Sequence, residues 1–123
     1  MTVPEENRFA QLDVWQISHK LVLKIYKTTN SFPKEEKFRL GDQLRRSASS
    51  VPTNIVEGNS RGHKKEYIQF LYLAKGSLEE TKYHLLLSKD LGYITSNQYD
   101  EFQGDCNKIG RMISGLIKHL KSY

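Results

Sequence analysis

Five basic side chains near the middle of the chain are the residues whose types and spacing could bind a ligand. They are Arg45, Arg46, Arg61, Lys64 and Lys65. The last three come at the predicted start of a helix, whose free backbone amides also attract anions. A cluster of this kind is typical of a phosphate-binding surface. The alternative is a solvated corner whose cations form salt bridges with Asp42 or Glu66.

Arg45 and Arg46 are adjacent, so on a helix their side chains point about 100° apart. They cannot share one narrow face. We expect one of the two to contact phosphate and the other to point into the bundle or into a subunit interface. The sequence alone does not say which arginine takes which role.

The net charge of the chain is +5, with a pI near 9.3. Residues 34–65 carry eight basic and four acidic side chains, so most of the excess charge lies in this segment. A local basic surface favours polyanions such as ribosomal RNA or another nucleic acid, or an acidic patch on a partner protein. A solvated helix face without a ligand is the alternative, because +5 is a modest charge for 123 residues.

Residues that could support catalysis or hold a metal do not form a known motif. The sequence contains no His-Glu-x-x-His, no phosphate-binding glycine loop and no Gly-x-Ser-x-Gly. Glu80 and His84 are four residues apart, whereas the di-metal sites of helical bundles use a spacing of three. Cys106 is the only cysteine, which excludes an internal disulfide, and its place in an apolar seam predicts a buried small hydrophobe. We therefore predict no enzyme activity, no metal and no cofactor.

Apolar residues recur at steps of three and four over four segments, which predicts four helices. Trp15 lies on the first apolar stripe and is expected in or near the core. In the third segment the predicted stripe is Tyr67, Leu71, Ala74, Leu78, Thr81 and Leu85, and Phe70, Leu73 and Leu86 are expected to thicken this apolar face. In the fourth segment the predicted seam is Tyr99, Phe102, Cys106, Ile109, Ile113, Leu116 and Leu120. The segments are residues 13–29, 33–57, 64–92 and 95–120.

The helix starts carry recognisable signals. Asp13 is the predicted N-cap of the first helix, with Gln16 completing a capping box. Pro33 suits the first position of the second helix. Thr95 and Gln98 form a second capping box at the start of the fourth helix.

Pro52 interrupts the second helical pattern. Proline in a helix interior removes one donor and clashes with the carbonyl four residues back, at a cost of roughly 3 kcal/mol. Either the helix ends near Val51 or it continues through a kink. We favour the kink, because the apolar pattern stays in phase to Ile55 and because Ser49 and Ser50 could hydrogen-bond the freed backbone.

Three residues after Pro52 are expected to have structural roles. Asn54 and Glu57 would be tied into the backbone or a neighbouring helix. Gly58 would end the helix as a C-terminal glycine. The same helix has a face of small residues that would let another backbone approach closely: Gly41, Ser47, Ala48, Ser49 and Ser50.

Short connections between the helices force neighbours to run antiparallel. The sequence therefore predicts an all-α, up-down-up-down antiparallel four-helix bundle with a proline kink in its second helix. Residues 1–11 are expected to be a flexible lead, and residues 12–123 a single domain. No apolar run is long enough for a membrane span, and the acidic N-terminus is unlike a secretory signal. We expect a reduced, cytoplasmic protein that does not bind membranes.

The chain resembles the small four-helix-bundle proteins encoded in intervening sequences of bacterial 23S ribosomal RNA genes, some of which are labelled ribosomal proteins. The most specific block is SVPTNIVEG at residues 50–58. His63 departs from the pattern, since the family often has Ser there, a better N-cap. The other matching residues are 12–16, 25–26, 32–36, 43–48, 61, 65–67, 70–71 and 74–80.

The resemblance implies a kinked bundle that assembles as a ring, commonly a homopentamer. A related branch of the family serves as the accessory protein of diversity-generating retroelements, which binds nucleic acid and a reverse transcriptase. The leading hypothesis is a non-enzymatic, oligomeric bundle that binds RNA or nucleic acid generally through a basic surface. The alternative is a protein-interaction module that binds an acidic protein or a reverse transcriptase and has no direct RNA role.

Overall fold

The structure, a computed structural model, describes residues 12–122, and these contain helices but no strand. Four long helices form the bundle, and a single helical turn precedes the second of them. The predicted all-α class is therefore confirmed. The helices are α1 (Asp13–Thr29), α2 (Lys34–Lys37), α3 (Leu40–Ser60), α4 (Lys64–Asp90) and α5 (Ser96–Lys121).

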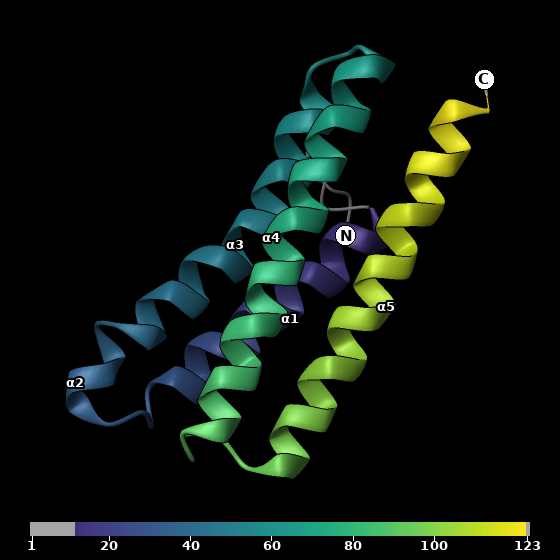
Figure 1. Ribbon diagram of the computed structural model, residues 1–123. Helices are drawn as coiled ribbons and strands as arrows, with labels where there is room; N and C mark the ends of the chain where they lie inside the picture. Colours follow the sequence, from purple (N-terminus) through teal and green to yellow (C-terminus); the bar gives the residue numbers. More distant parts are fainter. Residues whose placement is uncertain (1–11, 123) are drawn as a thin grey trace, which may run out of the picture.

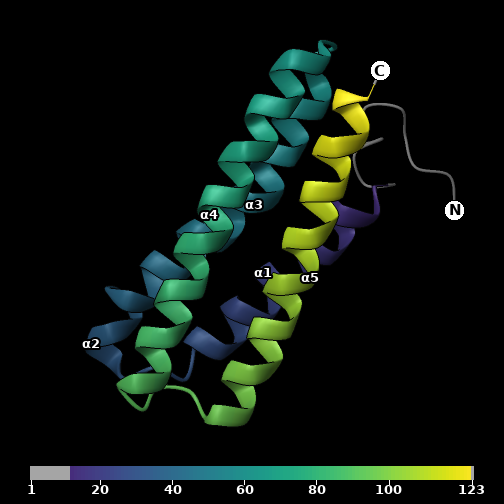
Figure 2. The same cartoon turned by 45° about the vertical axis from the view of Figure 1, so that its right-hand side comes forward.

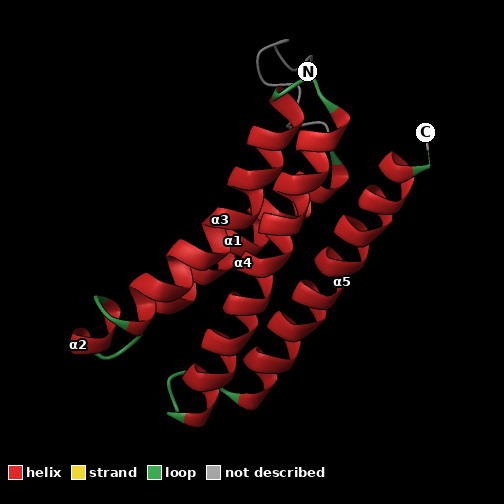
Figure 3. Ribbon diagram, turned by 45° about the horizontal axis from the view of Figure 1, so that its top comes forward, coloured by secondary structure: helices red, strands yellow, loops and turns green. Residues whose placement is uncertain are grey.

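The four long helices run alternately up and down, as predicted (Figure 1). The most extensive contact is between α3 and α4, and α1 packs against both α3 and α5. Figure 2 shows α5 lying alongside α4 in the antiparallel direction. Each long helix therefore packs against two others, and the four form a closed bundle. The connection between α3 and α4 and the C-terminal end of α5 lie at the same end of the bundle. The loops that join the long helices are short (Figure 3).

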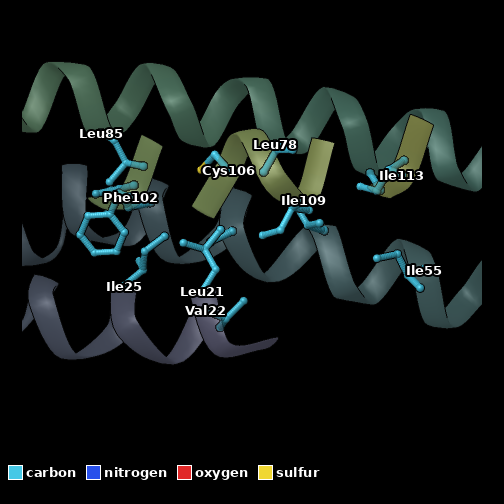
Figure 4. Close-up of a cluster of buried hydrophobic side chains, with 14 of the residues drawn as sticks. Leu21, Val22, Ile25, Ile55, Leu78, Leu85, Phe102, Cys106, Ile109 and Ile113 are labelled. Atoms are coloured by element: carbon cyan, nitrogen blue, oxygen red, sulfur yellow. The ribbon is translucent and has the colours of Figure 1, made fainter. Parts of the chain in front are cut away.

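The core contains side chains from all four long helices (Figure 4). On α5 the predicted seam of Phe102, Cys106, Ile109 and Ile113 is buried. Beyond Ile113 the buried position is Ile117, whereas the sequence pattern placed Leu116 and Leu120 in the seam; these two are only partly buried. A helix has 3.6 residues per turn, so a strict seven-residue seam drifts away from the core along a straight helix.

The predicted stripe of α4 is confirmed for most of its length, since Leu71, Ala74, Leu78, Thr81 and Leu85 are all buried. The expected thickening of this apolar face is wrong. The side chains of Leu73 and Leu86 are 57% and 37% exposed, and Phe70 is half-buried.

The start of α1 differs from the prediction. The N-cap is Leu12, and Asp13 is the first helical residue and makes no side-chain capping bond. Asp13 nevertheless favours the positive end of the helix dipole. Trp15 packs partly buried against the core and stacks on His19, with ring centroids 4.9 Å apart, which confirms its expected place.

The Thr95–Gln98 capping box of α5 is confirmed, with both reciprocal hydrogen bonds present.

The predicted second helix is divided. Its first turn is α2, and the chain then breaks at Phe38 and Arg39 before α3 begins at Leu40. Arg39 has φ −118° and ψ −92°, outside the helical region. The Arg45 guanidinium donates a 2.6 Å hydrogen bond to the carbonyl of Lys37. This bond satisfies one of the acceptors that the end of α2 leaves free.

Helix α3 continues through Pro52 to Ser60, so the prediction of one helix across the proline is confirmed, while the bend itself stays a prediction. Ser49 and Ser50 were expected to hydrogen-bond the backbone that Pro52 frees. The hydroxyl of Ser49 instead donates to the carbonyl of Arg45 at 2.6 Å. Asn54 is tied to the backbone as predicted, through a 2.8 Å bond from its amide to the carbonyl of Ser50.

Gly58 does not end α3, which is a correction to the sequence analysis. The helix ends two residues later at Ser60, and Gly62 with φ +74° takes the left-handed position after it. Gly58 is required for packing instead. A Cβ atom there would lie 2.7 Å from the Cβ of Phe70 and 2.9 Å from a ring carbon of Tyr67.

Part of the small-residue face of α3 packs against α4 of the same chain. The hydroxyl of Thr81 donates to the hydroxyl of Ser47 at 2.9 Å, and the hydroxyl of Ser77 donates to that of Ser50 at the same distance. Ala48 is fully buried. These residues therefore bring two helices of one protomer together.

The predicted lead, residues 1–11, lies outside the described residues, and the assignment of residues 12–123 to one domain stays a prediction. Within the described helices, none combines the length and the apolar character that a membrane crossing requires.

Candidate nucleic-acid interface

Arg45 is a structural residue that joins α3 to two neighbouring elements. Its guanidinium donates to the hydroxyl of Thr29 at 2.8 Å, to the carbonyl of Lys37 at 2.6 Å and to the carboxylate of Asp42 at 2.5 Å. The side chain is 16% exposed, and its carbon Cζ lies 5.9 Å from the ring centre of Tyr26. These donors are already in use, so Arg45 is not placed to contact phosphate.

Arg46 points away from the core and is exposed. It lines a hollow of about 540 Å³ together with Arg39, Phe38 and His84. The expectation that one arginine of the pair is structural and the other is on the surface is therefore met in the placement of the two side chains. Phosphate contact by Arg46 stays a prediction.

Arg61, Lys64 and Lys65 lie at the corner between α3 and α4, and all three are exposed. Arg61 pairs with Glu57 at 3.7 Å, and its guanidinium carbon lies 5.0 Å from the ring centre of Phe70. Glu57 is itself exposed, and this contact with a side chain at the end of its own helix is not the tie to the backbone or to a neighbouring helix that was expected. The N-cap of α4 is His63, whose side chain makes no capping hydrogen bond.

The five predicted residues do not form one surface. Arg46 and Arg61 are fifteen residues apart on a helix, which separates them by roughly 22 Å at 1.5 Å per residue. Arg45 is engaged inside the protomer. The corner of Arg61, Lys64 and Lys65 remains as the part of the prediction that the fold brings together.

The cations of α4 and α5 gather along the outer side of the contact between these two helices. Two adjoining hollows lie there, of about 450 and 310 Å³, and they share Lys75 and Ser114 as lining residues. We call this feature the α4–α5 groove. Glu79 is the single carboxylate among its described lining residues. Its basic side chains are Lys75 and Lys82 from α4, and Arg111, Lys118 and Lys121 from α5.

Most of this charge is available to a ligand. Lys82 pairs with Glu79 at 3.3 Å on the protein surface, an exposed contact of the kind that contributes little to stability. No carboxylate of the described residues pairs with Lys75, Arg111 or Lys118. The groove therefore has at least three basic side chains that pair with no carboxylate of the described residues.

Tyr72 and Lys121 lie at the end of the groove that is near the C-terminus of α5. The ammonium of Lys121 donates a 2.9 Å hydrogen bond to the Tyr72 hydroxyl and lies 5.3 Å from the centre of its ring. The hydrogen bond from Lys121 lowers the pKa of Tyr72. The tyrosine is still 48% exposed, so it presents an aromatic surface beside the cations.

One lysine of the corner lies on the same face of α4 as the lysines of the groove. Lys64 and Lys75 are eleven residues apart, which on a helix returns a side chain to within about 20° of the same face. Lys82 follows seven residues later, again within about 20°. The three lysines therefore form one stripe on the side of α4 that faces α5.

Sequence reasoning missed the groove because it summed charge over segments. Residues 66–92 carry three basic and four acidic side chains, and residues 93–123 carry four and three, so neither segment stands out. The signal was in the spacing. Lys75 and Lys82 are seven apart, as are Arg111 and Lys118, and a seven-residue step keeps side chains on one helical face.

The described residues contain no group of three or more His, Cys, Asp and Glu side chains that could hold a metal ion. Cys106 is fully buried, as predicted. Burial raises the pKa of its thiol to about 12, so the nucleophilic thiolate is scarce at neutral pH.

These observations define a small all-helical bundle protein with a basic groove along two of its helices. The model of the 23S rRNA-intervening sequence protein family matches residues 10–115, and the chain belongs to this family. Among curated proteins none matches the chain.

One solved structure shares the fold across most of its length. It is a protein of unknown function from the S23 ribosomal protein family of Bacteroides thetaiotaomicron. The two chains superpose with a TM-score of 0.80 at 28% sequence identity, over 85% of this chain and 95% of the other. The resemblance stated from the sequence is thereby confirmed at the level of the family.

Proposed function

We propose that this protein is a non-enzymatic bundle that binds RNA through the α4–α5 groove and the adjoining corner of Arg61, Lys64 and Lys65. The observation that carries the proposal is the gathering of basic side chains from two helices on one side of the bundle, of which Lys75, Arg111 and Lys118 pair with no carboxylate of the described residues. Several aligned cations bind a phosphate backbone by releasing its counterions, without needing base contacts. Membership of a family named for 23S rRNA intervening sequences makes ribosomal RNA the first candidate ligand.

The proposal includes self-association, with a homopentamer as the expected form. The support from this chain is a set of eight large hydrophobic residues that are exposed on the described part of the protomer. Such surface is typical of contacts with another protein molecule. These exposed residues are Leu23, Tyr26, Phe38, Leu73, Tyr83, Leu86 and Leu91, together with Tyr72, which lines the α4–α5 groove and is left out of the proposed contact.

The proposal also places the protein in the cytoplasm, the compartment of ribosomal RNA, and assigns it no catalytic step. The burial of Cys106, which raises the pKa of its thiol, supports the absence of a catalytic step.

Crosslinking with mapping of the attached peptides tests the proposal. The purified protein is crosslinked by ultraviolet light to RNA recovered from its host, and the modified peptides are identified by mass spectrometry. We expect crosslinks on peptides from α4 and α5, with sequencing of the recovered RNA naming the ligand. Crosslinks confined to α1 and α2, or none above the level of an unrelated basic protein, would contradict the proposal.

A second candidate function is a protein-interaction module for an acidic partner. The observation that favours it is the hollow beside Arg46, where two arginines surround Phe38, the most exposed of the large hydrophobic side chains at 72%. Exposed aromatic and arginine side chains are enriched at the centres of protein interfaces. Loss of partner capture from a host lysate on Phe38→Ser, with RNA crosslinking unchanged, would support this second function.

A further inference from the structure

The α4–α5 groove combines two features that select different parts of a nucleic acid. Its two walls carry cations, with Lys75 on α4 and both Arg111 and Lys118 on α5. Its end carries the exposed ring of Tyr72. Cations attract any phosphate backbone, whereas an aromatic ring gains stacking energy only from a base whose face is open.

Two packed helices form the walls of the groove. Helix axes in contact lie about 8–10 Å apart, and a Cβ at Gly110 would be in ordinary van der Waals contact with a methyl carbon of Leu78, at 3.5 Å. The cations of the two walls therefore face a single channel. One backbone strand lying in this channel is within reach of both walls.

A second exposed aromatic side chain of α4 lies outside the groove. Tyr83 is 59% exposed and directly follows Lys82 in the sequence, so the two side chains point about 100° apart on the helix. Lys82 lines the groove and Tyr83 does not. Tyr72 is therefore the ring that the groove offers to a base.

From this combination of cations and an exposed ring we infer that the groove binds single-stranded nucleic acid, with the backbone between the two helices and an unpaired base stacked on Tyr72. The inference rests on the proposed function and names its substrate class. In a duplex the base faces are covered by neighbouring pairs, so Tyr72 would contribute nothing to binding by stacking. Single strands of RNA and of DNA share the chemistry on which the inference depends.

The test compares the affinity for single and double strands by fluorescence anisotropy. The probes are a labelled single-stranded RNA of about 12 nucleotides, within the known range for groove binders, the DNA of the same sequence and the corresponding RNA duplex. The full-length wild-type protein is expected to bind both single strands at least tenfold more tightly than the duplex. Tighter binding of RNA than DNA would assign the natural ligand to RNA.

Variants separate stacking from charge. Tyr72→Ala should weaken single-strand binding roughly tenfold and leave duplex binding unchanged, whereas Tyr72→Phe should bind like the wild type. Tyr26→Ala is the matched control, because Tyr26 is also 48% exposed but lies on α1. It should not alter binding of either form. Thermal unfolding of each variant shows whether the fold is intact under the conditions of the assay.

The possible failures are distinguishable. Equal affinity for duplex and single strand, or an unchanged affinity in Tyr72→Ala, overturns the inference while RNA binding stands. A labelled poly-glutamate of equal charge that binds as tightly as the RNA would also overturn it, because the groove would then be a general polyanion surface. Failure of every nucleic acid to bind removes the proposed function itself.

Discussion

The guanidinium of Arg45 donates a 2.8 Å hydrogen bond to the hydroxyl of Thr29, the last residue of α1. Thr29 is itself buried and donates to the carbonyl of Ile25 at 2.9 Å. Together with the bond from Arg45 to Lys37, this contact fixes the end of α1 and the break after α2 to the first turns of α3. One side chain thus determines how the second helix of the bundle begins.

Replacing Arg45 by Ala should destabilise the protein by about 2 kcal/mol, because it leaves the buried Thr29 hydroxyl and the end of α2 without their partner. Arg46→Ala is the matched control, since this neighbour is exposed, and it should change stability by less than about 0.5 kcal/mol. Urea unfolding followed by circular dichroism measures both. Equal losses in the two variants would refute the structural role of Arg45.

Gly58→Ala should destabilise the protein by roughly 1–3 kcal/mol, the usual cost of forcing extra volume into a packed contact. The added carbon would meet Phe70 and Tyr67 at less than 3 Å. Gly76→Ala, also in a helix interior, has nothing within 4 Å and should instead stabilise by about 0.5–1 kcal/mol. Opposite shifts of the thermal midpoint are the expected result, and a stabilising Gly58→Ala would contradict the packing.

The ion pairs of Lys24 should make stability depend on pH. Lys24 joins α1 to α5 through Glu101 at 2.7 Å and Asp105 at 2.5 Å. Partial burial lowers the pKa of Lys24, but the hydrogen bonds with Asp105 and Glu101 outweigh this and raise it overall. The hydrogen bond from Lys24 lowers the pKa of Glu101.

The direction in which stability changes with pH follows from the shifts of these two pKa values. A carboxylate whose pKa is lowered by folding stabilises the fold at pH values above its pKa in the unfolded chain, about 4.3. This stabilisation is lost as the pH falls through the pKa of the folded state. A lysine with a raised pKa stabilises below about 10.4, and loses the effect as the pH rises through the folded pKa. Lys24→Gln should therefore destabilise more at pH 7 than at about pH 3.5, as measured by urea unfolding at both pH values. An equal loss at the two values would show that the ion pairs contribute nothing.

Self-association should be visible by light scattering coupled to size exclusion. A homopentamer predicts a mass near five times the 14.3 kDa of the chain. The physical reason is the exposed apolar surface, which includes Leu73 at 57% and Leu23 at 55% exposed. A mass of one chain at micromolar concentration would contradict the assembly.

The sequence was sufficient to predict the four long helices, because burial imposes regular spacing on residues such as Leu71, Leu78 and Leu85. It did not predict the break before Leu40. Neither Phe38 nor Arg39 is a residue that disfavours a helix strongly, and the carbonyl of Lys37 at the break accepts a hydrogen bond from Arg45, a tertiary contact that the local sequence does not show.

The candidate site was predicted only in part for a related reason. The corner of Arg61, Lys64 and Lys65 is local, so adjacency in sequence shows it. The α4–α5 groove is made by residues such as Lys75 and Lys118, which are far apart in the chain and meet only when α4 and α5 pack. Acidic residues elsewhere on the same helices cancel their charge in any count along the sequence.

The most direct measurement of RNA binding by the groove is the dependence of affinity on salt for two matched double variants. Lys75→Gln with Lys82→Gln removes two groove cations seven residues apart on α4. Lys20→Gln with Lys27→Gln removes two exposed lysines at the same spacing on α1. Each lost phosphate contact reduces the slope of log affinity against log salt by about 0.7 for a single strand and about 0.9 for a duplex. The slope of the groove variant should therefore be smaller by roughly 1.4 to 1.8, while the α1 variant keeps the slope of the wild type. An unchanged slope in the groove variant, or an equal loss in both variants, would contradict RNA binding by the groove.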